Sequence, residues 1–534
     1  MKTKLEKYKN LEILLILFLQ IILYHNVAQF DFVWDDAFLI QNNPYFNHPF
    51  HFLQIFGSGF WELSSLENPV PYYRPLVSLL YVVQHKVFGF FAGGYHLVNL
   101  AFHLLNITLV WILAKRFGLN RLGSFICSVI FSLHPTQVHT VCFISSQGDI
   151  LCAFFSLLTI LFWTSEKKIK WLSLLWISAA LMFKEAAAIL PIVLLGHDVI
   201  LKKKSIRDLK NWIPFLILIP YFILRTYGLK NIQPYQANSP WIWDSMGGFR
   251  IFLFIGRILF PIPYPPEITV PEISAASRLL FHAAFLILIG VIFLKTKSNP
   301  KLRFFCIWFF LTLLLVADWF DYHLRFSDQL LYIPLISLSY ICGLAVHRNK
   351  KLLYVFIFMS AFYVYFSNSQ IGTWKNNVRL WSSALDHDPT NPTFSLNFAV
   401  SLLNNGFQKD GCDWMEYARK MNIEKNDPNL FRLIYFNLGN CNLYEQPLVA
   451  EDFFRLALRY DEHYFPAQYN LIQALLNQKK NKEAYEQARN LIEKEPNRVN
   501  SWEIWSYILK MNGDLKGSRE ATKRAEQLRL LNSK

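Results

Sequence analysis

Long apolar runs occupy most of the first 370 residues. The segments LEILLILFLQIILY (11–24), LVNLAFHLLNITLVWILA (97–114) and LLYVFIFMSAFYVYF (352–366) hold at most one formally charged residue each. Such runs predict membrane helices, because about 20 apolar residues cross the hydrocarbon core of a bilayer. Helix-length reasoning divides this region into about eleven predicted spans, at 11–29, 97–114, 122–138, 149–164, 170–184, 186–201, 212–227, 278–294, 302–317, 329–346 and 352–368. The first run lacks a small-residue cleavage site, so it is not predicted to be a cleaved signal peptide.

Lys and Arg cluster between the predicted spans, in residues 2–9, 115–116, 167–170, 202–204, 295–301 and 348–351. Cytosolic loops are enriched in basic residues, so these clusters predict the cytosolic side. An odd number of spans then places the N-terminus inside and the end of the chain outside. Four polar stretches fall on the predicted outer face, namely residues 30–95, the turn at 134, residues 228–277 and residues 318–328. Within the third, FRIFLFIGRILF is predicted to be an interfacial or re-entrant helix.

Composition agrees with a membrane protein, since 53% of the residues are hydrophobic and 17% are aromatic. The net charge is +15, but it is unevenly distributed. Residues 371–534 hold 22 of the 53 Lys+Arg and 20 of the 38 Asp+Glu, which leaves 31 and 18 in residues 1–370. The basic excess therefore belongs to the membrane region, where orientation in the bilayer explains it, and no nucleic-acid partner is predicted.

The last 160 residues or so are less apolar and show helical periodicity and a repeat. Small residues recur every 34 positions, at Ala450, Ala484 and Ser518, as in tetratricopeptide repeats. We therefore predict an all-α chain with two domains: a polytopic membrane domain over 1–370, and a tetratricopeptide α-solenoid of about four units over 371–534 on the outer side. Cys412 and Cys441 lie in the second domain and would form a disulfide only outside the cytosol.

Two adjacent acids follow the first predicted span, in FVWDDAFLIQNNPYF (32–46). One interpretation of Asp35 and Asp36 is a helix-capping turn, because Asp satisfies free N–H groups at a helix start. The other is catalytic: mutual repulsion and aromatic surroundings raise a carboxyl pKa, which makes a general base near neutral pH. The pair is also a candidate ligand for a divalent cation such as Mg or Mn.

Candidate substrate-binding residues lie on the same predicted face. Arg74 stands in PYYRPLVSLLY, and Lys184 and Glu185 stand in FKEAAAILP. Charges at a membrane surface are costly and are often functional, so Arg74 and Lys184 are candidates for neutralising a phosphate. The alternatives are snorkelling of Arg74 and an ion pair between Lys184 and Glu185. His134 is a further candidate, although a membrane histidine is more often a hydrogen-bonded core residue.

Several segments, in order, resemble the transmembrane and tetratricopeptide-repeat O-mannosyltransferases of the GT-C glycosyltransferase superfamily and their bacterial relatives. They are WDDAFLIQNNP, YYRPLVSLLY, GYHLVNLAFHLLN, HPTQVHTVCFISSQGDILCAFF, FKEAAAILP, SDQLLYIP and WKNNVRLWSSALDHDPTNP. The resemblance implies a GT-C membrane domain that transfers a sugar, mannose or another hexose, from a polyprenyl-phosphate carrier to a hydroxyl of an exported protein. It implies inversion at the sugar, with Asp35 or Asp36 as the base. A bacterial inner membrane is expected rather than the endoplasmic reticulum, with the repeats in the periplasm or lumen.

Three positions depart from the family pattern. His139 stands where the family usually has Glu, Gln147 where it usually has Arg, and Gln329 where it often has Arg. These departures bear on donor choice or on activity itself. Two other hypotheses therefore stand beside the enzyme: an inactive GT-C-like membrane scaffold whose repeats bind protein partners, and a transporter of lipid-linked sugars. The transporter is disfavoured because the long loops lie on one face and no inverted repeat is evident.

Overall fold

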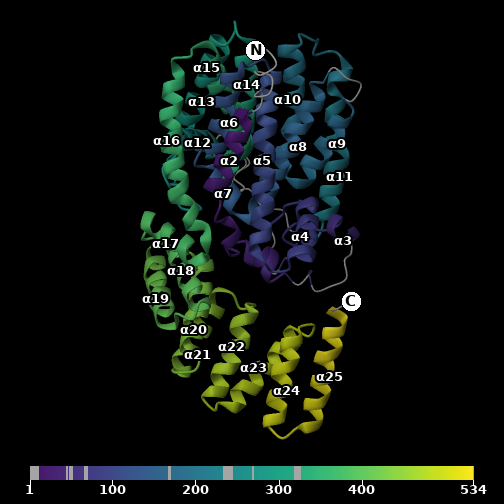
Figure 1. Ribbon diagram of the computed structural model, residues 1–534. Coiled ribbons are helices and arrows are strands. Elements are labelled where there is room, and N and C mark those ends of the chain that lie inside the picture. Colours follow the sequence, from purple (N-terminus) through teal and green to yellow (C-terminus); the bar gives the residue numbers. More distant parts are fainter. Residues whose placement is uncertain are drawn as a thin grey trace. The chain divides into compact units, whose positions relative to one another are not determined.

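The computed structural model describes residues 11–43, 46, 52–64, 70–165, 170–232, 245–267, 270–317 and 326–532. These residues form helices joined by loops, which confirms the all-α prediction (Figure 1). The chain divides into two compact units, Met1–Phe46 with Phe50–Asn376, and Asn47–Pro49 with Asn377–Lys534. The predicted basic cluster at 2–9, most of that at 167–170, and residues 318–325 of the predicted outer turn lie outside the described residues.

The first unit is a bundle of long helices with shorter ones at its ends (Figure 1). Its α-helices are α2 (Leu11–Leu23), α3 (Phe52–Phe56), α4 (Pro75–Phe88), α5 (Ala92–Arg116), α6 (Arg121–Leu133), α7 (Gln137–Cys142), α8 (Gln147–Trp163), α9 (Leu172–Phe183), α10 (Leu190–Gly196), α11 (Leu218–Gly228), α12 (Gly247–Leu259), α13 (Ala275–Lys295), α14 (Pro300–Val316), α15 (Tyr332–Arg348) and α16 (Leu352–Ile371). Short 3-10 or π segments join several of them, including η1 (Val27–Gln29), η2 (Ala37–Gln41), η5 (Glu185–Ile189), η6 (His197–Leu201), η7 (Leu209–Ile217) and η9 (Asp328–Leu331).

Six helical segments within the described residues are long and apolar enough to cross a membrane, which makes the chain a multi-pass membrane protein. They are Leu11–Gln29, Ala92–Arg116, Ile144–Trp163, Ala275–Lys295, Asp328–Arg348 and Leu352–Lys375. The other five predicted spans correspond to shorter or broken helices, such as α6 and α9. The total of about eleven spans therefore stays a prediction.

Close helix packing in the bundle depends on small residues. Where α6 crosses α15, a methyl group on Gly123 would lie 2.7 Å from the carbonyl oxygen of Gly343. A methyl group on Gly343 would in turn collide with the Gly123 backbone. Because lipid supplies no hydrophobic force between helices, such close approach of small residues is a main source of packing energy in membranes.

The two ends of α8 have different surroundings. At its start, the Ser145 N–H donates to Asp36 over 2.9 Å. At its end, Trp163 Nε1 donates to Asp198 over 3.3 Å, and Asp198 binds Lys204 at 2.6 Å. A helix of 17 residues is about 26 Å long, so Asp36 and Lys204 lie near opposite ends of the bundle.

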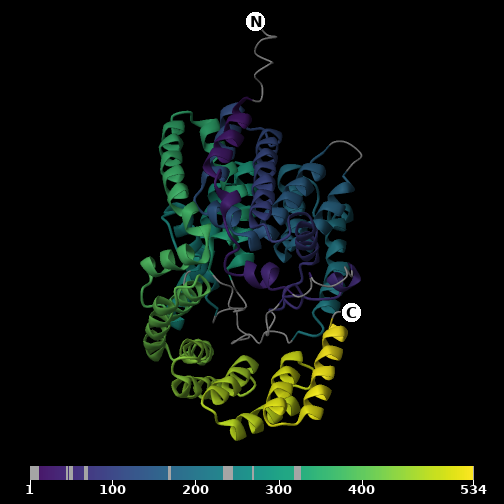
Figure 2. The ribbon, with the colours of Figure 1, turned by 60° about the horizontal axis from the view of Figure 1, so that its bottom comes forward.

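The second unit is a stack of antiparallel helices that follow one another along an arc (Figure 2). They are α17 (Asn377–His387), α18 (Pro392–Asn404), α19 (Gln408–Lys425), α20 (Pro428–Asn442), α21 (Pro447–Tyr460), α22 (Phe465–Asn477), α23 (Asn481–Lys494), α24 (Val499–Met511) and α25 (Leu515–Asn532). Each helix packs mainly on its neighbours in sequence, as in a helical repeat. Ala450, Ala484 and Ser518 are buried in α21, α23 and α25, so the 34-residue spacing marks equivalent helices.

A disulfide joins α19 to α20 through Cys412 and Cys441. The sequence left this pairing open, because it depends on the compartment. Disulfides persist in oxidising compartments and are rare in the cytosol. The other five cysteines are free and lie in the membrane unit.

Candidate active site

Asp36 anchors the segment that follows α2. It is fully buried, and one carboxylate oxygen accepts the Val33 N–H at 3.0 Å. The other oxygen accepts the Ser145 N–H at 2.9 Å and the Ser145 hydroxyl at 2.5 Å. Burial raises the pKa of Asp36 to about 7, against the effect of these hydrogen bonds. Asp36 therefore ties the acidic segment to the start of α8, and both of its oxygens are engaged.

Asp35 is half-buried and lies beside this anchor. Its own carbonyl accepts the backbone N–H groups of Phe38 and Leu39, so the chain turns into η2 immediately after it. Trp34, which precedes it, has a φ of 53°. A bulky residue in the left-handed region stores strain on the order of 1–2 kcal/mol, and such strain is often found at functional sites. Of the two acids, Asp35 is the one with access to solvent.

An aromatic cluster packs against the acidic segment. The Trp34 ring stacks on Phe143 with centroids 5.4 Å apart, and Phe143 lies 5.3 Å from Trp374. His139 contacts Trp374 at 4.5 Å. These rings come from three separate parts of the first unit, so they hold the strained turn in position.

Arg74 and Glu185 form a bidentate ion pair. Arg74 Nε lies 3.1 Å from one Glu185 oxygen, and Nη2 lies 2.6 Å from the other. Burial disfavours charge on both groups, but the pairing raises the pKa of Arg74 above its ordinary value and lowers that of Glu185 to about 2. The guanidinium also lies 4.4 Å from the centre of the Tyr72 ring. Two of its five N–H donors face Glu185, which leaves three for other groups.

Tyr81 connects this pair to the acids. Burial raises the pKa of Tyr81, and the charges of Asp36, Arg74 and Asp35 all act on the same hydroxyl. Asp35, Asp36 and Arg74 therefore all lie in the electrostatic surroundings of Tyr81.

Lys184 pairs with Asp149, in the first turn of α8. Its Nζ lies 2.6 and 2.7 Å from the two Asp149 oxygens, and both side chains are 8% exposed. The sequence-based alternative of a Lys184–Glu185 pair is wrong, because Lys184 contacts Asp149 whereas Glu185 contacts Arg74. The two adjacent residues point to different partners because Lys184 is extended between α9 and η5.

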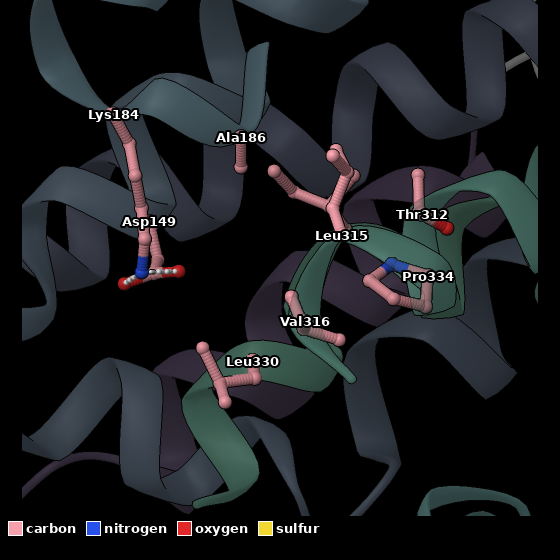
Figure 3. A pocket seen from close by; sticks show the side chains of 9 residues that line it. Asp149, Lys184, Ala186, Thr312, Leu315, Val316, Leu330 and Pro334 are labelled. Carbon is pink, nitrogen blue, oxygen red and sulfur yellow. Dashed lines mark hydrogen bonds and ion pairs between the residues drawn. The ribbon is translucent and has the colours of Figure 1, made fainter. Parts of the chain in front are cut away.

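A small cavity of about 20 Å³ lies beside the Lys184–Asp149 pair (Figure 3). Figure 3 shows this pair at one side of the pocket and Leu315, Val316 and Pro334 at the other. The lining is otherwise mainly apolar, from the end of α14 and the start of α15. The pocket therefore combines one charged group pair with an apolar wall.

A third buried ion pair joins α12 to η9. Arg257 Nε and Nη2 lie 2.7 and 2.5 Å from the two oxygens of Asp328, and the side chains are 2% and 6% exposed. Arg257 also donates to the carbonyl of Ile262. Arg257 was not predicted from the sequence to be a site residue, although a charge inside an apolar helix is a recognised indication of function.

The two histidines differ in their surroundings. His134 is buried, with Nδ1 2.8 Å from the Thr136 hydroxyl and Nε2 3.1 Å from the Ile258 carbonyl oxygen. Both of its nitrogens are thus engaged within the protein, and the structure does not place it for substrate contact. His139 is also buried, but its Nε2 has no hydrogen-bond partner. Burial lowers the pKa of His139 to about 4, so its ring is neutral at physiological pH.

The two glutamines that depart from the family pattern also make specific contacts. Gln147 exchanges hydrogen bonds with Gln84 over 3.0 and 3.2 Å. Gln329 accepts the Ser146 hydroxyl at 2.5 Å. Uncharged side chains here are therefore integrated into the packing around the start of α8.

The described residues contain no group of three or more His, Cys, Asp or Glu placed to hold a metal ion. Asp36 fits poorly as a cation ligand, since N–H or O–H donors occupy both of its oxygens. The mechanism proposed below therefore uses no divalent cation at Asp35 and Asp36.

Comparison with known proteins gives distant relatives of one kind. A protein O-mannosyl-transferase of Caenorhabditis elegans, F38B6.6, is 24% identical over 422 residues, covering 74% of this chain and 61% of its own length. The mouse protein O-mannosyl-transferase TMTC2 is 30% identical over 140 residues, covering 26% and 17%. The Drosophila melanogaster protein O-mannosyl-transferase Tmtc3 is 23% identical over 295 residues, covering 46% and 31%. No protein-family model matches the chain.

The chain thus spans about three fifths of the worm relative and about one sixth of the mouse relative. Among solved structures, the crystal structure of MamA covers 29% of this chain and 88% of its own, with a TM-score of 0.26 and 17% identity. The sequence comparisons indicate distant homology to protein O-mannosyltransferases.

Proposed function

We propose that this protein transfers a hexose, of which mannose is the first choice, from a polyprenyl-phosphate carrier to a Ser or Thr hydroxyl of an exported protein. The observation that carries the proposal is a half-buried acid, Asp35, next to a buried and hydrogen-bonded Asp36, with the Arg74 charge acting on the same Tyr81 hydroxyl as both acids. Distant homology to protein O-mannosyltransferases supports the same activity.

In this mechanism, Asp35 is the general base. The acceptor oxygen bonds to the anomeric carbon of the sugar while its proton passes to Asp35. The bond between that carbon and the phosphate oxygen breaks, and its electron pair leaves with the polyprenyl phosphate. Attack opposite to the leaving group inverts the configuration. A positioned base of this kind contributes a factor of about 10²–10⁴ to the rate.

Asp36 is a positioning residue rather than the base. It is fully buried, and both of its oxygens already accept hydrogen bonds from Val33 and Ser145, so an acceptor hydroxyl has no access to it. Loss of Asp36 is therefore expected to act through the position of Asp35. This division of roles refines the sequence-based prediction, which treated both acids as candidate bases.

Arg74 and Lys184 supply positive charge for the leaving phosphate. Each is oriented by its carboxylate partner, and Arg74 keeps three N–H donors that do not face Glu185. Lys184 lies at the edge of the small cavity in Figure 3, beside apolar residues of α14 and α15. Charge fixed in advance at a poorly solvated site stabilises the developing phosphate charge without reorganisation.

The disulfide supports a periplasmic or lumenal position for the repeat unit, since a Cys412–Cys441 bond is stable outside the cytosol. A stack of helix pairs is also suited to binding polypeptide, which is the proposed acceptor. The membrane in question, whether the bacterial inner membrane or the endoplasmic reticulum, is part of the proposal.

Intact-mass and glycopeptide analysis of exported proteins tests this function. Cells with the wild-type gene should carry hexose on Ser or Thr of at least one exported protein. Cells that lack the gene, or carry Asp35→Asn, should lose that modification. If Asp35→Asn restores it fully, the base assignment is wrong. If deletion changes no glycan but releases partner proteins from the membrane, the scaffold hypothesis replaces the enzyme.

A further inference from the structure

A strongly basic loop lies at the end of the bundle opposite the candidate active site. We define the basic loop as residues 202–210, from the end of η6 to the first two residues of η7, all of which are exposed. It contains five cationic side chains and one acid. The cations are Lys202, Lys203, Lys204, Arg207 and Lys210. The acid, Asp208, accepts the backbone N–H of Lys210 as the cap of η7, so it belongs to the local fold.

Specific contacts fix the geometry of the basic loop. Asp198, 1% exposed, binds Lys204 at 2.6 Å and His197 at 2.8 Å. At the other side, the Asn211 side chain donates to the Ser205 carbonyl at 3.0 Å. Lys204 is therefore the residue that fastens the loop to the bundle.

The other four cations are available to a ligand. Within the part of the chain that the structure describes, no ion pair is recorded for Lys202, Lys203, Arg207 or Lys210. Lys203 also has a φ of 54°, a left-handed conformation that is uncommon for a residue other than glycine. A fixed loop with four exposed cations and no acidic partner is an anion-binding surface.

Apolar side chains are interleaved with these cations. Ile206 is 55% exposed and Leu209 is 82% exposed. Trp212 follows at 41%, with its ring nitrogen bonded to the Ile206 carbonyl at 2.8 Å. Exposed Ile, Leu and Trp beside Lys and Arg are the composition of a segment that lies in the interface between headgroups and acyl chains.

We propose that the basic loop binds the phosphate groups of anionic phospholipids in the leaflet opposite the candidate active site. Lys202, Lys203 and Arg207 contact the headgroups, while Ile206 and Leu209 insert between the upper acyl chains. Free phosphate has no apolar part that could contact Ile206 and Leu209, so the arrangement favours a lipid. The proposal depends only on the protein lying in a membrane, and it stands or falls separately from the glycosyltransferase function.

Native mass spectrometry of the full-length protein tests this proposal. Purified protein is titrated with phosphatidylglycerol, with phosphatidylcholine and with inorganic phosphate. Each exposed cation near an anionic surface gives roughly a fivefold preference, so three together contribute a factor of about 100 to the preference for phosphatidylglycerol. The triple variant Lys202→Gln, Lys203→Gln, Arg207→Gln should lower this preference at least about tenfold, and Lys210 accounts for what remains.

The turn between α15 and α16 provides a matched control. Arg348, Lys350 and Lys351 are exposed, equal in charge to the removed set, and have no exposed apolar residue between them. Changing all three to Gln should leave the phosphatidylglycerol preference intact. The proposal is overturned if both triple variants lose lipid equally, if the first loses none, or if phosphate competes as well as phosphatidylglycerol. If the first variant does not insert correctly into the membrane, the salt dependence of the wild type is the test. Salt at about 0.5 M should release phosphatidylglycerol from the wild-type protein, and retention of this lipid overturns the proposal.

Discussion

Removing the positive charge of Lys184 should destabilise the membrane unit strongly. Lys184→Met keeps much of the side-chain volume but leaves the Asp149 carboxylate without its partner. Both side chains are 8% exposed, so water cannot replace the lost contact. Breaking a buried ion pair from one side costs about 3–5 kcal/mol, because an uncompensated charge stays in the interior.

A second variant separates the part of this destabilisation that comes from the lost ion pair from the part that comes from the buried, uncompensated charge. Lys184→Met together with Asp149→Leu removes both charges, and replacing a buried pair by apolar residues is often neutral or stabilising. We therefore expect the double variant to recover most of the loss. With roughly 2 °C per kcal/mol for a large domain, the single variant should unfold about 6–10 °C below the wild type.

Thermal unfolding in detergent, followed by the loss of monodisperse protein on size exclusion, measures both variants. The Arg489–Glu493 pair on α23 is the control, since its side chains are 68% and 66% exposed. Arg489→Met should change the unfolding temperature by less than about 2 °C, as exposed pairs contribute about 0–1 kcal/mol. A Lys184→Met protein as stable as the wild type would refute the assignment of a buried pair. Under the proposed function, the stable double variant should still lose sugar transfer, because the phosphate loses a cation.

Three other predictions concern stability. Burial raises the pKa of Asp36 to about 7, above its unfolded value, so stability should fall as pH rises from about 4 to about 7 and then level off. Asp36→Asn should remove this pH dependence of stability. It should also lower the free energy of unfolding by about 1–3 kcal/mol, because an amide cannot accept all three hydrogen bonds that the carboxylate accepts. Thermal unfolding at about pH 5 and pH 8 measures both effects. Gly439→Ala should cost about 1–3 kcal/mol, since the added methyl would overlap the Phe454 ring, and hydrogen exchange in α20 and α21 should report it. Reduction of the Cys412–Cys441 bond, which closes a loop of 29 residues, should cost about 3–4 kcal/mol in the repeat unit of the wild type and nothing in the double Cys→Ser variant.

The sequence predicted the class of fold because hydrophobicity is a local property. Apolar runs gave the long helices α5, α15 and α16, and the 34-residue spacing gave the equivalent helices of the repeat unit. It did not predict where α10 and η6 break the segment 186–201, or why α6 and α9 are short. Such breaks depend on buried polar contacts between helices, which no single segment reveals.

The sequence singled out the acids and cations of the candidate site but not their contacts. That Asp35, Asp36 and Arg74 serve one site stays a prediction, supported by the action of all three charges on Tyr81. The pairing of charges was not predictable, because Arg74 and Glu185 are 111 residues apart in sequence. The distinct roles of Asp35 and Asp36 likewise depend on Ser145, whose contact with Asp36 spans 109 residues.

Sugar transfer by the purified protein tests the central proposal most directly. Full-length protein in proteoliposomes is supplied with labelled polyprenyl-phosphate mannose and a peptide rich in Ser and Thr. We predict that label reaches the peptide with the wild type and that Asp35→Asn slows transfer by about 10²–10⁴. Equal transfer by the wild type and by Asp35→Asn, in protein shown to be folded, would contradict the role of Asp35 as the base.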